Sequence, residues 1–105
     1  MENNLLLALG LCRKAGKLVM GFDPVVEAMV SGKVKLLITT ADLSPKSLKN
    51  ITYEAQKYGI APRAASLTME ETKAMLGRRT GILAVLDPGL AGMVEKKLSC
   101  ENEED

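Results

Sequence analysis

Basic side chains cluster where the sequence predicts that helices and strands meet. They are Lys17, Lys33, Lys35, Lys46, Lys49, Arg78 and Arg79. The first backbone N–H groups of a helix have no acceptor within the helix, and its dipole places partial positive charge at the same end. Lysine and arginine add full charges to that field, so the combination favours binding of phosphate groups. Ordinary helix capping with solvated lysines is the alternative explanation of the same residues.

Catalytic chemistry has little support in the side chains. The chain has no His, so it lacks the usual general base and the commonest metal ligand. Cys12 and Cys100 have neither zinc nor redox spacing, and we expect reduced thiols in a cytoplasmic protein. The segment from Gly10 to Leu18 resembles a phosphate loop, but Leu18 stands where that motif needs a hydroxyl. We therefore expect no catalytic residue, no metal and no cofactor.

Length and composition predict a single folded domain. The chain has 105 residues, of which 47 % are hydrophobic and 26 % are charged, and this excludes a disordered or collagen-like protein. Residues 1–100 hold all 14 basic side chains and nine of the 13 acidic ones, and the other four acidic side chains lie in residues 101–105. We expect a domain over residues 1–100 with a net charge of +5, which is compatible with a polyanionic partner, and a disordered acidic tail over residues 101–105.

Glycine and proline divide the chain into alternating helices and strands. Helices are predicted over residues 3–14, 24–31, 45–58, 69–76 and 88–98, and strands over residues 17–20, 34–39, 62–65 and 81–86. Asp23, Ser44 and Asp87 each precede a proline, as a capping residue before the first helical turn does. The residues from Thr68 to Glu71 have the spacing of a capping box. This alternation predicts an α/β fold, a three-layer α/β/α sandwich around a small mixed sheet.

The order of these motifs resembles that of a known family. The matching segments are Arg13-Lys14-Ala15-Gly16-Lys17, Gly21, Ser31-Gly32, Lys35-Leu36-Leu37-Ile38, Thr40-Ala41-Asp42-Leu43-Ser44-Pro45, Tyr58-Gly59-Ile60, Leu76-Gly77-Arg78 and Ile82-Leu83-Ala84-Val85. Over about residues 5–95 the chain is similar to the kink-turn RNA-binding ribosomal proteins of the L-seven-Ae and L-thirty-e type and to their small bacterial relatives. The resemblance implies an α/β/α sandwich without cofactor or catalysis. It also implies binding to a sharply bent internal loop of structured RNA, in the ribosome or its assembly.

The resemblance also implies which residues bind RNA. They are Lys17, Gly21, Asp23, Lys33, Ser44, Leu48, Arg78 and Arg79. In this assignment Gly21 and the helix start at Asp23 capture the RNA backbone, and the basic side chains contact phosphate. Leu48 packs on a base, and Ser44 stands where the family reads a flipped base.

One motif departs from the family pattern. The family reads RNA with Gly-x-Asn-Glu-x-x-Lys, of which only the glycine is kept here, as Gly21. Asp23 lacks the amide donor of asparagine, and Pro24 lacks the carboxylate of glutamate and a backbone N–H. Glu27 reverses the charge of the lysine and so opposes the main electrostatic term in RNA binding.

These departures leave a second hypothesis open. The chain would have kept the fold, lost kink-turn recognition, and become a protein-interaction or dimerisation module. Phe22, Val25 and Val26 would then form an exposed apolar patch for a protein partner or a second copy.

Overall fold

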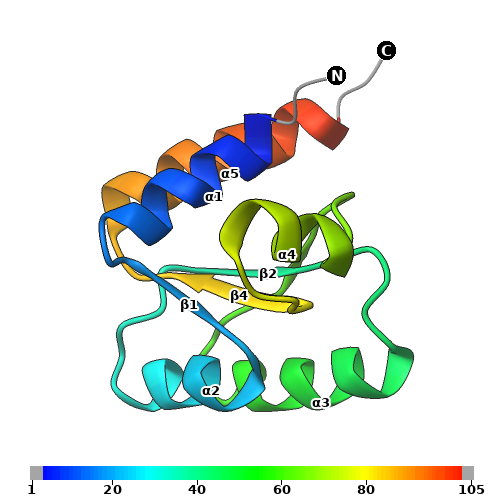
Figure 1. Cartoon of the computed structure of the whole chain (residues 1–105). Coiled ribbons are helices and arrows are strands. Elements are labelled where there is room, and N and C mark those ends of the chain that lie inside the picture. Colours follow the sequence, from blue (N-terminus) through cyan, green and yellow to red (C-terminus); the bar gives the residue numbers. More distant parts are fainter. Residues whose placement is uncertain (1–3, 103–105) are drawn as a thin grey trace.

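The computed structural model describes residues 4–102 and confirms the predicted α/β/α sandwich, with helices on both faces of a mixed sheet (Figure 1). The helices are α1 (Asn4–Lys14), α2 (Phe22–Val30), α3 (Pro45–Gln56), α4 (Met69–Leu76) and α5 (Pro88–Asn102). The strands are β1 (Leu18–Met20), β2 (Leu36–Thr39), β3 (Arg63–Ala64) and β4 (Ile82–Val85).

The four strands lie in the order β1-β4-β2-β3. Strand β4 runs antiparallel to β1 and β2, whereas β2 and β3 are parallel. The amino end of β4 therefore lies beside the carboxyl ends of the other three strands. We call this side of the sheet the carboxyl edge, and it comprises Gly21 and residues 40–44, 65–68 and 77–81.

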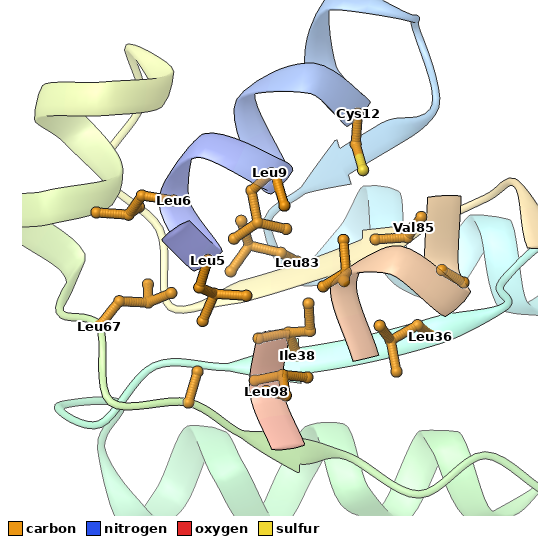
Figure 2. Close-up of a cluster of buried hydrophobic side chains, with 14 of the residues drawn as sticks. Leu5, Leu6, Leu9, Cys12, Leu36, Ile38, Leu67, Leu83, Val85 and Leu98 are labelled. Carbon is orange, nitrogen blue, oxygen red and sulfur yellow. The ribbon is translucent and has the colours of Figure 1, made fainter. Parts of the chain in front are cut away.

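Each face of the sheet is covered by a hydrophobic layer. Helices α1, α4 and α5 cover one face, with the cluster drawn in Figure 2, and helices α2 and α3 cover the other. Successive residues of β2 and β4 alternate between the two layers because strand side chains point to opposite sides. The first layer receives Leu36, Ile38, Leu83 and Val85, and the second receives Leu37, Ile82 and Ala84. Burial on both faces explains why these strands are continuous apolar runs.

Three predicted helix starts are confirmed. The Ser44 hydroxyl accepts a hydrogen bond from the backbone N–H of Ser47 at 3.1 Å and caps α3. Thr68 opens α4 with a complete capping box. An Asp87 carboxylate oxygen accepts from the N–H of Leu90 at 2.9 Å and caps α5.

The predicted cap of α2 is wrong. The helix begins at Phe22 with Gly21 as its N-cap, and no side chain caps it, so Asp23 lies in the first turn instead of before it. The cause is a contact from outside the segment, because the N–H of Gly21 donates to the carbonyl of Ile82 in β4 at 2.9 Å. That bond keeps the chain on the sheet up to Gly21. Pro24 fits the first turn because the N–H groups there have no acceptor in the helix.

The last helix is longer than predicted. It continues past Leu98 to Asn102, so the first two residues of the expected disordered tail are helical. Residues 103–105 lie outside the described residues, and the disorder expected for them stays a prediction. Among the helices of residues 4–102, none has both the length and the hydropathy that crossing a bilayer requires.

The Cys12 thiol is expected to be protected from thiol reagents at neutral pH. Cys12 is fully buried, and its burial, followed by the negative charge of Asp87, raises the pKa of its thiol above the ordinary value of 9.0. Since the thiolate is the reactive form, the folded Cys100→Ser variant should react far more slowly with an aromatic disulfide than the same variant in urea. Equal reaction rates for the folded and the urea-unfolded variant would contradict the burial of the Cys12 thiol.

Candidate nucleic-acid interface

Three helices begin at the carboxyl edge. Helices α2, α3 and α4 follow β1, β2 and β3 directly, so their N-termini lie on one side of the sheet. Side chains already cap α3 and α4, and the Asp42 carboxylate also accepts from the N–H of Met69 at 3.1 Å. Helix α2 has no side-chain cap. Of the three N-termini, that of α2 is therefore the best able to bind an anion from outside the protein.

Arg78 lies over this uncapped helix start. A Cβ atom at Gly21 would be 3.1 Å from Nη2 of Arg78 and 3.7 Å from its Cζ. Gly21 has φ 101° and ψ 156°, a conformation essentially restricted to glycine. Arg78 is exposed and has no ion pair or side-chain hydrogen bond within residues 4–102. A guanidinium that no other described residue pairs with thus adjoins the positive end of α2.

Arg13 is a residue that the sequence analysis did not assign to the site. Its Nη1 and Nη2 atoms lie 3.9 Å and 4.0 Å from the position of a Cβ at Gly77, the residue before Arg78. In the sequence, Arg13 reads as a cation in the last turn of a helix, and it also belongs to the segment Arg13–Lys17 that resembles the family. Only the packing of α1 against α4 shows that it reaches the carboxyl edge.

Arg79 is in a different situation from Arg78. Its Nε atom donates to Oε2 of Glu70 at 3.1 Å, and its Nη1 lies 3.6 Å from the sulfur of Met69. The side chains of Arg79 and Glu70 are 54 % and 71 % exposed, so this ion pair is weak in energy. It nevertheless places a carboxylate beside Arg79, which makes Arg79 less attractive to phosphate than Arg78.

The loop between β2 and α3 is held against Gly81, which precedes β4, and Leu67, which precedes α4. The N–H of Thr40 donates to the carbonyl of Gly81 at 3.0 Å, and the N–H of Ala41 donates to that of Leu67 at 2.9 Å. A Cβ at Gly81 would be only 2.7 Å from Cδ1 of Leu43, so this loop packs closely on the residue that precedes the strand. The loop leads to Ser44 and Leu48, which therefore keep a fixed position relative to β4.

Ser44 and Leu48 lie on consecutive turns at the start of α3. The Ser44 hydroxyl is occupied by its capping bond, and the N–H of Leu48 donates to the carbonyl of Ser44 at 2.9 Å. The Leu48 side chain is 41 % exposed, so it offers an apolar surface to solvent at this edge. Such a surface suits an unstacked base.

Two predicted residues lie elsewhere. The carbonyl of Lys17 accepts from the N–H of Leu86, which follows β4, whereas Gly21 bonds to Ile82 at the other end of that strand. Four residues at about 3.3 Å each separate Lys17 from Gly21 by roughly 13 Å. Lys33 follows the carboxyl end of α2 and lines a shallow pocket with Leu86. The carboxyl edge and the adjoining beginnings of α2 and α3 thus carry six of the eight predicted residues, namely Gly21, Asp23, Ser44, Leu48, Arg78 and Arg79.

The apolar patch of the second hypothesis is not exposed. Val25 is completely buried, and Phe22 and Val26 are partly buried and pack against the layer beneath the sheet. These three side chains therefore stabilise the packing of α2 and leave little surface for a protein partner.

Acidic side chains limit the positive charge of the edge, and they do not form a metal site. Asp23 and Glu27 are exposed on α2, one turn apart. Among residues 4–102, no group of three or more His, Cys, Asp and Glu side chains is arranged to hold a metal ion.

Two curated proteins are similar to this chain in sequence, although no family model matches it. The chain is 32 % identical over 88 residues to RNA-binding protein YlxQ of Bacillus subtilis, a match that spans 79 % of this chain and 83 % of that protein. It is 30 % identical over 83 residues to large ribosomal subunit protein eL30B of Schizosaccharomyces pombe, which spans 77 % of this chain and 71 % of that protein.

Solved structures share the fold. A Bacillus halodurans protein of unknown function superposes with a TM-score of 0.82 at 23 % identity and covers 93 % of this chain and 99 % of its own. The Giardia lamblia 15.5kD RNA binding protein superposes with a TM-score of 0.70 at 14 % identity and covers 97 % of this chain and 91 % of its own. At these identities the likeness establishes the α/β/α arrangement alone.

Proposed function

Because this chain belongs to the family of ribosomal proteins of the L-seven-Ae and L-thirty-e type, we propose that it binds structured RNA at the carboxyl edge of its sheet. In this proposal it is a non-catalytic, cytoplasmic component of a ribonucleoprotein, in the ribosome or its assembly, and its target is a kink-turn or a related internal loop. The single observation that supports the site most strongly is the guanidinium of Arg78 over the uncapped start of α2, with no ion-pair partner in residues 4–102.

The geometry suits a bent RNA better than a straight duplex. A sharp bend in an internal loop brings phosphates of both strands together, so a compact group of cations gains more there than on a regular helix. Arg78 supplies a guanidinium group beside Gly21, Arg13 supplies one beside Gly77, and α2 supplies free backbone N–H groups. Leu48 would cover a base that the bend displaces from the stack.

The altered reading motif affects how the RNA would be recognised. Asp23 and Glu27 place negative charge on the helix that the family uses to read base edges. Carboxylates accept hydrogen bonds but repel phosphate, so they favour contacts to base amino groups over contacts to the backbone. The proposal therefore assigns most of the binding energy to backbone N–H groups and arginines, and recognition would depend on RNA shape more than on base identity.

The deciding experiment is a titration of the purified protein with a kink-turn RNA and a straight duplex of matched composition, at about 50 mM and 200 mM salt. We expect clear preference for the bent RNA at both concentrations and weaker binding at the higher one. Equal, salt-sensitive binding to both RNAs would contradict kink-turn recognition and leave a general basic RNA binder. Absence of binding to either RNA would contradict the proposed function as a whole.

A further inference from the structure

Helix α3 carries a row of cationic and aromatic side chains along its solvent face. Lys46, Lys49, Tyr53 and Lys57, the last being the C-cap residue of α3, follow one another at intervals of three, four and four residues, and we call them the α3 row. At about 100° per residue they lie within roughly 80° of one another around the helix axis. All four are exposed, and the buried residues of this helix, Ile51 and Ala55, belong to the core. The row therefore faces solvent along the whole helix.

The charges of the row are largely unneutralised. Lys46 and Lys49 form no ion pair with any residue that the structure describes, whereas Lys57 pairs with Glu54 at 3.2 Å. The Nζ atom of Lys57 also lies 4.8 Å from the ring centroid of Tyr53. A solvated helix face explains exposed lysines, but Tyr53 with 61 % of its surface exposed is apolar area that solvent does not stabilise. A tyrosine between lysines suits a ligand with both phosphates and flat or ribose surfaces.

The row is continuous with the carboxyl edge. Lys46 comes two residues after Ser44, which caps α3 at that edge. From Lys46 to Lys57 the helix extends about 17 Å at 1.5 Å per residue. The row thus leads away from the carboxyl edge along α3, which lies with α2 in one layer (Figure 1). A ligand centred on the carboxyl edge that reached the end of the row would need an extended, negatively charged arm.

We propose that the α3 row binds the sugar-phosphate backbone of one RNA stem that flanks the bent loop. Its lysines contact phosphates, and Tyr53 packs on a ribose or an unpaired base. This inference rests on the proposed function, because the bent loop at the carboxyl edge positions the stem. An RNA stem would account both for the positive charge of the row and for its start at the carboxyl edge. An acidic protein would account for the charge alone.

The test compares stem lengths. The Lys49→Ala/Tyr53→Ala double variant is matched with a Lys96→Ala control, whose exposed lysine lies on α5 across the sheet. Each protein is titrated with a kink-turn RNA that has two long stems and with versions in which one stem or the other is truncated. We expect one truncation to weaken binding by the wild type and the control about tenfold. The double variant should bind the long RNA about tenfold more weakly and lose nothing further on that truncation, since the two changes remove the same contact.

The salt dependence supplies a second readout. With the long RNA, the slope of log affinity against log salt should fall by about one for the lysine that the double variant lacks. Unchanged thermal melting would show that the double variant is folded. If the double variant binds every RNA as tightly as the wild type, the proposed role of the α3 row is wrong, whereas the proposed site at the carboxyl edge is unaffected. If the wild type binds none of the RNAs, the proposed function itself has failed, so the two failures are distinguishable.

Discussion

The Arg78→Ala variant is expected to bind a kink-turn RNA about 10- to 100-fold more weakly than the wild type. A hydrogen bond to a charged group contributes roughly 1.5–3 kcal/mol, and each 1.4 kcal/mol is about a factor of ten in affinity. Arg78 adjoins the uncapped end of α2, and no residue from 4 to 102 forms an ion pair or hydrogen bond with its side chain that would compete with phosphate. A titration at constant salt measures the loss.

Arg79→Ala is the matched control for this substitution. It removes the same charge from the neighbouring position, but Arg79 already pairs with Glu70. Its effect on affinity should be no more than a few-fold, and neither variant should change the unfolding midpoint because both side chains are exposed. Arg78→Lys should fall between the wild type and Arg78→Ala, since lysine keeps the charge but lacks the planar fork. Equal losses for Arg78→Ala and Arg79→Ala would show that only net charge matters and would contradict the assigned geometry.

The Gly21→Ala variant is expected to lose both stability and RNA affinity. The conformation of Gly21, with φ 101° and ψ 156°, costs a residue with a Cβ on the order of 1–3 kcal/mol. The new methyl group would also lie 3.1 Å from Nη2 of Arg78, so the guanidinium would have to shift by a few tenths of an ångström from its place over the start of α2. Urea unfolding measures the first effect, and titration with kink-turn RNA measures the second under conditions where the variant is folded.

Gly10→Ala provides the control for the added methyl group. Gly10 lies inside α1, and no described heavy atom outside its own helical surroundings lies within 4 Å of the Cβ position. Alanine there should stabilise the protein by up to about 1 kcal/mol and leave RNA binding unchanged. If Gly21→Ala weakens binding through the displaced guanidinium, the Gly21→Ala/Arg78→Ala double variant should bind about as weakly as Arg78→Ala alone. Unchanged stability and affinity in Gly21→Ala would contradict the described site.

Local patterns in the sequence predict much of the fold. The caps at Ser44, Thr68 and Asp87 were predictable because each cap and its N–H donor lie within three residues of one another. The strands β2 and β4 were predictable because burial on both faces makes them apolar throughout. Together these elements were enough to predict the α/β/α class.

The candidate site depends on contacts that no local pattern encodes. The start of α2 was misplaced because the bond from Gly21 to Ile82 exists only once β1 and β4 pair. Helix packing likewise decides that Arg13 of α1 reaches Gly77, the residue that follows α4. In each case two segments distant in sequence must meet in space. Periodicity and capping rules do not predict such long-range contacts.

The bonds that tie Gly21 to Ile82 of β4 and Thr40 to the preceding Gly81 have a consequence for the order of events in binding. Two loops of the carboxyl edge are fastened to a central strand of the sheet or to the residue before it, so little chain entropy remains to be lost when a ligand arrives. A flexible internal loop of RNA samples straight and bent forms, and a rigid surface stabilises the form that it fits. The protein would then act as a template: the conformational change would belong to the RNA, and the bent population would rise in proportion to the difference in affinity for its two forms.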